Sequence, residues 1–169
     1  RHPETCSLAL LTKDPGACAA HSNNNANLLL HNGLTKGKNM LGIELKSCIR
    51  VTYAKDYFNG NHFHPYYELV YYYKGHGQVN ILGTNHTFEA GTYSVSRPEA
   101  YHNEEGVKDT DVIYISFTLN NFEMENGLYR DDGTIGKLML ECYNELQERK
   151  PMFQLVLNNL AERIVLQFM

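Results

Sequence analysis

The chain contains 169 residues, of which 43% are hydrophobic and 20% are charged. This size and composition are typical of one globular domain and exclude a wholly disordered chain or a fibrous repeat. The net charge is −4, and the sequence from Leu41 onward contains 11 basic and 17 acidic residues. Because proteins bind nucleic-acid phosphates with basic surfaces, we do not expect this stretch to contact DNA directly.

Targeting and redox signals are few. The four cysteines are scattered and form no CxxC pair, so neither a zinc knuckle nor a dithiol redox site is indicated, and we expect reduced thiols. No apolar run approaches the ~20 residues that a transmembrane helix needs. The N-terminus also lacks a basic flank followed by an apolar core. We therefore expect a cytoplasmic protein with no membrane partner.

Residues 1–40 differ from the remainder. They contain the polar tract His-Ser-Asn-Asn-Asn-Ala-Asn at 21–27 and turn-forming residues at 14–16 and 36–39. We expect an N-terminal arm or irregular segment with only short elements. The chain begins with Arg1 rather than Met and ends at Met169 within an apolar helical pattern. These ends suggest a fragment of a longer polypeptide.

The next segment, residues 41–130, is predicted to be a β-barrel. Short stretches rich in Tyr, Val, Ile, Phe and Thr alternate with glycine-bearing turns, as in small sandwiches and barrels. The expected strands are Ile43–Tyr53, Glu68–Lys74, Gln78–Leu82, Thr87–Phe88, Thr92–Arg97 and Asp111–Leu119. Both faces of the last strand are partly apolar, which predicts the barrel interior on one side and packed helices on the other.

After Gly133 the hydrophobic period changes from two to that of a helix. One apolar stripe is formed by Ile135, Leu138, Met139, Cys142, Tyr143 and Leu146. We expect Thr134 to cap this helix and Pro151 to occupy the first position of a second helix.

The second helix carries two apolar surfaces. Its main stripe is Phe153, Val156, Leu157, Leu160, Ala161, Ile164 and Phe168, and a second set is Met152, Leu155, Leu166 and Met169. One surface can pack on the barrel, and the other is left for a partner. We therefore expect residues 131–169 to be a helical dimerisation and linker segment that forms a homodimer by two-fold self-pairing.

Four residues form a candidate metal-binding set. His62, His64 and Glu68 have the same parity, so in an extended strand they project from one face. His102, beyond the turn at Gly91, is the candidate fourth ligand. Imidazoles and a carboxylate suit a divalent Zn, Ni, Fe or Mn ion. The alternative is a hydrogen-bonded polar cluster that holds no metal, and in either case we expect convergence inside the barrel.

The spacing of these residues resembles a known pattern. His-x-His-x-x-x-Glu, six residues and Gly75, then Gly91, Pro98 and His102, resembles the paired motifs of the cupin superfamily. Asp56 stands where a cupin glycine usually precedes the first His, and the segment from Pro98 to His102 is one residue short. These departures resemble the sensory domains of AraC-type transcription regulators. The resemblance covers about residues 46–169.

The resemblance implies a mainly β fold, a cupin-like double-stranded β-helix (jelly-roll) barrel followed by two C-terminal α-helices. It also implies an effector-sensing and dimerisation domain, with DNA bound only through a C-terminal helix-turn-helix domain not present here. The alternative is a small metal-dependent cupin enzyme, an isomerase or dioxygenase in which the ion acts as Lewis acid or oxygen site. We favour the sensory domain, because the two helices resemble the segment that joins such a barrel to its DNA reader.

The expected effector is a small polar metabolite such as a sugar. Tyrosine rings offer flat faces for a sugar ring and hydroxyls for its polar groups, and an arginine can bind a carboxylate or phosphate. The candidate ligand-binding residues are Tyr66, Tyr72, Tyr93, Arg97 and His102, which we expect to line the barrel near its mouth. The alternatives are plain barrel packing for the tyrosines and a surface ion pair for Arg97.

Overall fold

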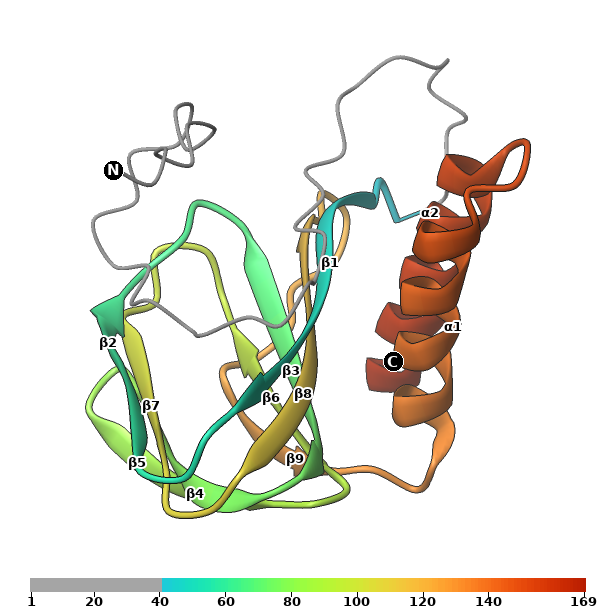
Figure 1. The fold of residues 1–169 in the computed structure, drawn as a ribbon. Coiled ribbons are helices and arrows are strands. Elements are labelled where there is room, and N and C mark those ends of the chain that lie inside the picture. Colours follow the sequence, from blue (N-terminus) through green and yellow to red (C-terminus); the bar gives the residue numbers. More distant parts are fainter. Residues whose placement is uncertain (1–40) are drawn as a thin grey trace, which may run out of the picture.

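The computed structural model describes residues 41–169, so the predictions for residues 1–40 lie outside the described residues (Figure 1). Within 41–169, strands form two antiparallel sheets that face each other. The first sheet has the order β1 (Glu44–Tyr53), β8 (Thr110–Thr118), β3 (Tyr67–Lys74), β6 (Thr92–Ser96) and β9 (Gly127–Arg130). The second has the order β2 (Tyr57–His62), β7 (His102–Gly106), β4 (His76–Ile81) and β5 (Thr84–Glu89).

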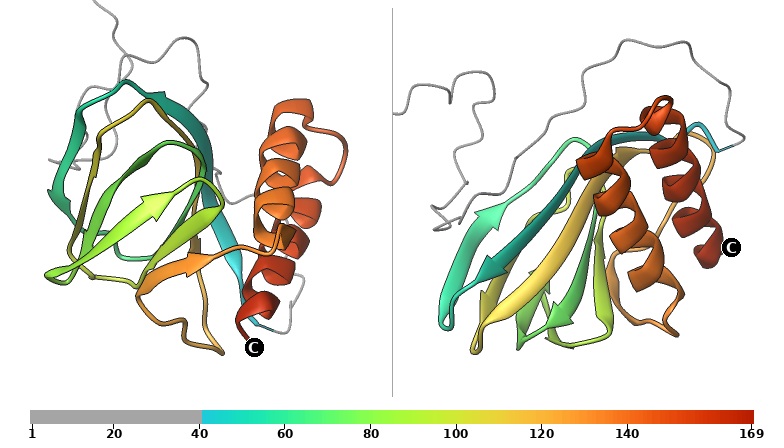
Figure 2. Two further views of the ribbon diagram at one scale, coloured as in Figure 1. Left: turned by 90° about the horizontal axis from the view of Figure 1, so that it is seen from below. Right: turned by 45° about the vertical axis from the view of Figure 1, so that its right-hand side comes forward.

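Two helices follow the strands and cover the outer face of the five-stranded sheet (Figure 2). They are α1 (Thr134–Glu148) and α2 (Phe153–Val165), and a 3₁₀ turn, η1 (Leu166–Phe168), follows α2. The prediction of a jelly-roll barrel followed by two helices is therefore confirmed. In the part of the chain described, no helix is long and apolar enough to cross a membrane.

The larger hydrophobic core lies between the five-stranded sheet and the helices. Fully buried members include Leu69, Ile113, Ile115 and Phe117 from the sheet and Met139, Cys142, Leu157 and Ile164 from the helices. On β8, Ile113, Ile115 and Phe117 belong to this layer, whereas Val112 belongs to the barrel interior. The prediction that this strand has apolar contacts on both faces is confirmed.

The smaller core fills the space between the two sheets. It consists of Val51, Tyr72, Val79, Ile81, Phe88 and Val112. Tyr72 and Phe88 are both fully buried, and their rings stack with centroids 4.0 Å apart. Residues that line the barrel from the five-stranded sheet therefore alternate with residues that contact the helices.

Three strands were not predicted. They are β2, β7 and β9, whose sequences are Tyr-Phe-Asn-Gly-Asn-His, His-Asn-Glu-Glu-Gly and Gly-Leu-Tyr-Arg. Asn, Gly and Glu have low strand preference. They interrupt β2 and make up most of β7, and β9 has only four residues, so none of the three gives a clear strand signal. Backbone pairing with neighbours supplies the stabilisation instead: β7 lies between β2 and β4, and β9 pairs with β6.

The predicted starts of both helices were wrong. Thr134 is the first residue of α1 rather than its cap, and Gly133 precedes it in a left-handed conformation with φ of 100°. The free N–H groups of the first turn are bound by two preceding carboxylates, Asp131 and Asp132. The second helix, α2, begins at Phe153, two residues after Pro151, because Met152 has a left-handed conformation with φ of 71°.

Replacing Asp131 with Ala is expected to lower the free energy of unfolding by about 1–2 kcal/mol. Its carboxylate accepts hydrogen bonds of 3.0 Å from the N–H groups of Ile135 and Gly136 and from the Tyr71 hydroxyl. Urea unfolding monitored by circular dichroism measures the change. Asp132→Ala is the matched control and should have a smaller effect, because Asp132 accepts one hydrogen bond at an exposed position.

Candidate functional site

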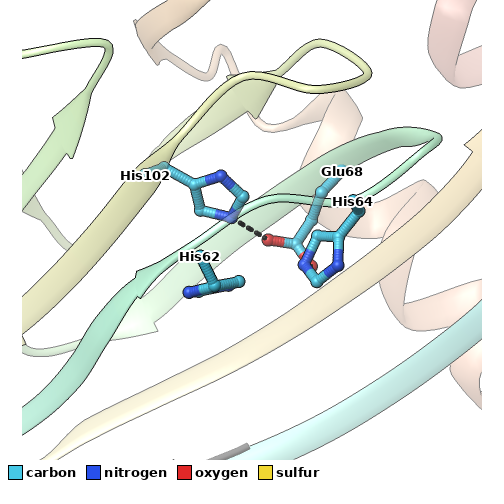
Figure 3. A group of neighbouring side chains, drawn as sticks. All are labelled: His62, His64, Glu68 and His102. Carbon is cyan, nitrogen blue, oxygen red and sulfur yellow. Dashed lines mark hydrogen bonds and ion pairs between the residues drawn. The ribbon is translucent and has the colours of Figure 1, made fainter. Parts of the chain in front are cut away.

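The four candidate metal ligands lie together inside the barrel (Figure 3). His62 is the last residue of β2, His64 lies in the connection to β3, Glu68 is on β3, and His102 is the first residue of β7. One ligand atom from each residue lies within 4.8 Å of the others. The spacing of the motif therefore identified residues that the fold brings together.

The predicted arrangement along one strand face was wrong. His62 belongs to the four-stranded sheet and Glu68 to the five-stranded sheet, so the two side chains approach each other across the interior. The connection contains Pro65, which has no N–H group with which to continue a strand ladder. His102 is the first residue of β7, and it lies opposite His62 in the register of β2 and β7.

Backbone carbonyls orient two of the imidazoles. Nδ1 of His62 lies 2.7 Å from the Gly60 carbonyl oxygen, and Nδ1 of His102 lies 2.8 Å from that of Ala100. A carbonyl oxygen only accepts, so each Nδ1 carries the proton. In the neutral form Nε2 then has a free lone pair, which is how metal-binding histidines are held in proteins.

Glu68 is the anionic centre of the group. Its Oε1 lies 3.2 Å from Nε2 of His102, and its Oε2 lies 3.5 Å from Nε2 of His64. Burial opposes ionisation of Glu68, but the contacts with His102 and His64 outweigh burial and hold its pKa well below the usual range. Burial likewise disfavours charged His102, yet the Glu68 carboxylate raises the pKa of His102 above its usual value.

The geometry fits a divalent metal ion. Both ring nitrogens of His64 are buried and make no hydrogen bond within the described chain, although buried polar groups normally have partners. Metal–ligand bonds of about 2.1 Å place neighbouring ligand atoms roughly 3.0–3.4 Å apart. The contacts of Glu68 at 3.2 Å and 3.5 Å are close to this range. These residues can therefore hold a divalent metal ion, which would also give His64 a partner.

A second buried carboxylate, Glu104, was missed by the sequence analysis. It accepts hydrogen bonds from the hydroxyls of Tyr72, at 2.8 Å, and of Tyr57. Burial raises the pKa of Glu104 to about 6. Its position two residues after His102 on the same strand is a signal that could have identified it as facing the interior.

The five candidate ligand-binding residues are dispersed. Tyr66 stacks on His64 with ring centroids 5.7 Å apart. His102 belongs to the set of four candidate ligands His62, His64, Glu68 and His102, hereafter the metal-type group. Tyr72 is fully buried in the apolar interior, where its hydroxyl is engaged by Glu104. The expectation that Tyr72 lies near the mouth is therefore corrected.

Tyr93 and Arg97 lie outside the barrel interior. Tyr93 belongs to the core beneath the helices and packs against Tyr129 and Phe168. The expected inward position of Tyr93 is corrected, because it is its neighbour Ser94 that reaches the interior Tyr72 hydroxyl. Arg97 forms ion pairs with Glu123 at 2.6 Å and Glu125 at 3.9 Å. This is the surface ion pair that the sequence left open as an alternative.

Comparisons with known proteins give a family and a fold. A family described as the AraC-like ligand binding domain matches residues 46–164. A search of curated proteins found no match. Among solved structures, YhaK from Escherichia coli has 9% identity and a TM-score of 0.51, with 64% of this chain and 52% of that chain covered.

Two further solved structures have lower scores. An RmlC-like cupin from Shewanella frigidimarina has 15% identity and a TM-score of 0.42, with 53% of this chain and 94% of that chain covered. A predicted oxalate decarboxylase from Thermotoga maritima has 20% identity and a TM-score of 0.42, with 46% and 69% covered. At these identities a structural likeness concerns the fold alone.

Proposed function

The chain belongs to the AraC-like ligand-binding domain family, and on this premise we propose that it is the effector-sensing and dimerisation domain of an AraC-type transcription regulator. The family match over residues 46–164 is the observation that carries the proposal. DNA contact is assigned to a helix-turn-helix domain outside residues 1–169. The excess of acidic over basic residues from Leu41 onward supports this division of roles.

The proposed effector is a small polar metabolite, such as a sugar or sugar acid, that binds inside the barrel. His62, His64, Glu68 and His102 would hold a divalent Zn, Ni, Fe or Mn ion, and the bound ion would supply a Lewis-acid contact for an oxygen of the effector. Tyr66 offers an aromatic face beside His64. We retain Tyr66 and His102 as ligand contacts and no longer assign Tyr72, Tyr93 and Arg97 to the effector.

The proposal is tested by asking whether a compound binds to the protein without being converted. The protein is incubated with a panel of monosaccharides and sugar acids, with and without Zn²⁺, while thermal unfolding is followed. A sensing domain should be stabilised by at least one compound, because a ligand that binds the folded state raises the unfolding midpoint. Nuclear magnetic resonance should then show that the compound is recovered unchanged.

The second candidate function is a metal-dependent cupin enzyme, an isomerase or dioxygenase. The observation that favours it is the group of four ligand side chains, which resembles a catalytic site as closely as a binding site. Conversion of a bound compound that requires the metal and is lost in Glu68→Gln would establish the enzyme and contradict the sensing role.

The dimer is proposed to form through α2 and the residues around it. Large apolar side chains are exposed there, with Met152 at 64%, Leu155 at 57%, Leu166 at 44% and Met169 at 73%. Since such side chains favour burial against a partner, replacing Leu155 and Leu166 with Glu should convert a dimer to a monomer while the barrel stays folded. Sedimentation measures the mass. Val107→Glu, at an apolar position 51% exposed on the barrel, is the control.

A parent chain that is monomeric at high concentration would contradict the proposed dimer. A double variant with unchanged mass would show that the dimer contact lies on the barrel strands and not on the helices.

A further inference from the structure

A row of three serines crosses the inner wall of the five-stranded sheet at the level of Glu68. The register pairs Glu68 on β3 with Ser116 on β8 and with Ser96 on β6. Ser116 is paired in turn with Ser47 on β1. Directly opposite residues of adjacent strands point to the same face of a sheet. Because Glu68 points into the barrel toward His102, the three serines face the interior as well.

Within residues 41–169, the hydroxyls of this serine row make no hydrogen bond to another protein group. Ser47, Ser96 and Ser116 are only 7%, 4% and 5% exposed. Their oxygens are nevertheless not among the fully buried polar atoms without a partner, which within residues 41–169 are the two ring nitrogens of His64, so the serine oxygens border accessible space. Ser94 differs: its Oγ lies 3.3 Å from the Tyr72 hydroxyl. A hydroxyl that borders accessible space and makes no hydrogen bond within the described chain can donate to and accept from a ligand.

The deeper levels of the same wall are less polar. The next level pairs Val70 with Ser94 and Tyr114, and the one below pairs Tyr72 with Val112. Tyr72, Val112 and Val51 are part of the apolar interior core. The three serine hydroxyls thus lie at the level of Glu68, where the candidate metal ligands meet.

We propose that Ser47, Ser96 and Ser116 recognise the hydroxyl groups of a polyhydroxylated acid whose carboxylate is bound by the metal ion. This inference rests on the proposed function and specifies the effector class. A serine hydroxyl both donates and accepts, as an alcohol does, so an uncharged row matches alcohol groups. Serine is also the smallest hydroxylated side chain and takes up little space beside Glu68.

The net charge of the metal-type group with a bound divalent ion explains why we expect the ligand to be an acid. A divalent ion held by neutral histidines and one carboxylate leaves a net positive charge, which one ligand carboxylate neutralises. Arg97 and Arg50 do not offer a positive charge to the ligand, because Arg97 is paired with Glu123 and Arg50 with Asp111.

The test compares two acids of equal chain length in titrations of the Zn²⁺-loaded protein. D-gluconate carries hydroxyls along its carbon chain, whereas hexanoate carries the carboxylate alone. The wild type should bind gluconate at least ~10-fold more tightly, and each Ser→Ala change should weaken gluconate binding by roughly 3–10-fold, as expected for one hydrogen bond. The triple variant S47A/S96A/S116A should lose the preference while its Zn²⁺ affinity and unfolding midpoint stay unchanged or rise.

Thr87→Ala removes an exposed hydroxyl from β5 and is the matched control that should change nothing. Equal binding of the two acids by the wild type would overturn the inference, as would a triple variant that keeps the preference. If the triple variant does not fold, the single variants Ser96→Ala and Ser116→Ala decide by the same comparison.

Repeating the titrations without Zn²⁺ separates this inference from the proposed function. Suppose that the wild type binds no Zn²⁺ but prefers gluconate, and that the triple variant shows no such preference. This result refutes the metal role and supports the serine row. A wild type that binds Zn²⁺ without any preference between the acids refutes the serine row alone.

Discussion

Replacing Glu68 with Gln is expected to lower the affinity of the protein for Zn²⁺ by at least ~100-fold. The substitution keeps the shape of the side chain but removes its negative charge, and a neutral amide is a much weaker ligand for a divalent ion. It also deprives the Nε2 atoms of His102 and His64 of their carboxylate contacts at 3.2 Å and 3.5 Å. Competition with a chelating dye measures the affinity.

The matched control is Glu89→Gln. Glu89 is half-exposed on β5, where its carboxylate pairs with Arg130, and it lies apart from the metal-type group. This variant should bind Zn²⁺ as the wild type does. If Glu68→Gln also binds with unchanged affinity, the four residues are a hydrogen-bonded polar cluster and the metal assignment is wrong.

Replacing Gly77 with Ala is expected to destabilise the barrel by more than ~3 kcal/mol, beyond the effect of most single substitutions. A Cβ atom at Gly77 would lie 2.0 Å from the Glu105 carbonyl oxygen and 2.6 Å from Cζ of Phe88. The carbonyl belongs to the backbone of the adjacent strand β7, and Phe88 is fully buried. Neither neighbour can move aside without disturbing the sheet or the interior core.

Gly60→Ala is the control for this substitution. The nearest atom to a Cβ at Gly60 is Cε1 of Phe58 at 3.9 Å, an ordinary contact distance. Urea unfolding should therefore show a change of less than ~1 kcal/mol for Gly60→Ala. Equal midpoints for Gly77→Ala and the wild type would mean that β4 and β7 are not packed as closely as described.

The sequence predicted the parts of the fold whose side chains carry the hydrophobic pattern. The stripe that begins at Ile135 marks α1, and the two apolar faces of β8 indicated its place between the barrel interior and the helices. The polar strands β2 and β7 could not be predicted in this way, because their stability comes from pairing with strands distant in the sequence. Local composition does not encode those partners.

The candidate site was predicted by spacing, and its geometry was not. Parity grouped His62, His64 and Glu68, but it could not reveal that the chain changes sheets around Pro65. Parity also leaves open which face of a strand is the inner one, so Tyr93 was placed inside although it packs beneath the helices. Glu104 had the correct parity relative to His102, but no recognised spacing drew attention to it.

The wall between the candidate site and the helices is one strand thick. On β3, Glu68 lies at the centre of the metal-type group, and the next residue, Leu69, is fully buried in the core shared with α1 and α2. A single peptide unit thus separates the ligand-facing surface from the helix-bearing surface. A displacement of β3 on ligand binding would move both side chains together. It would therefore change how the helices pack on the sheet, and no other residue would be needed to transmit the change. In a sensor of this construction, the helices would respond to the position of one strand.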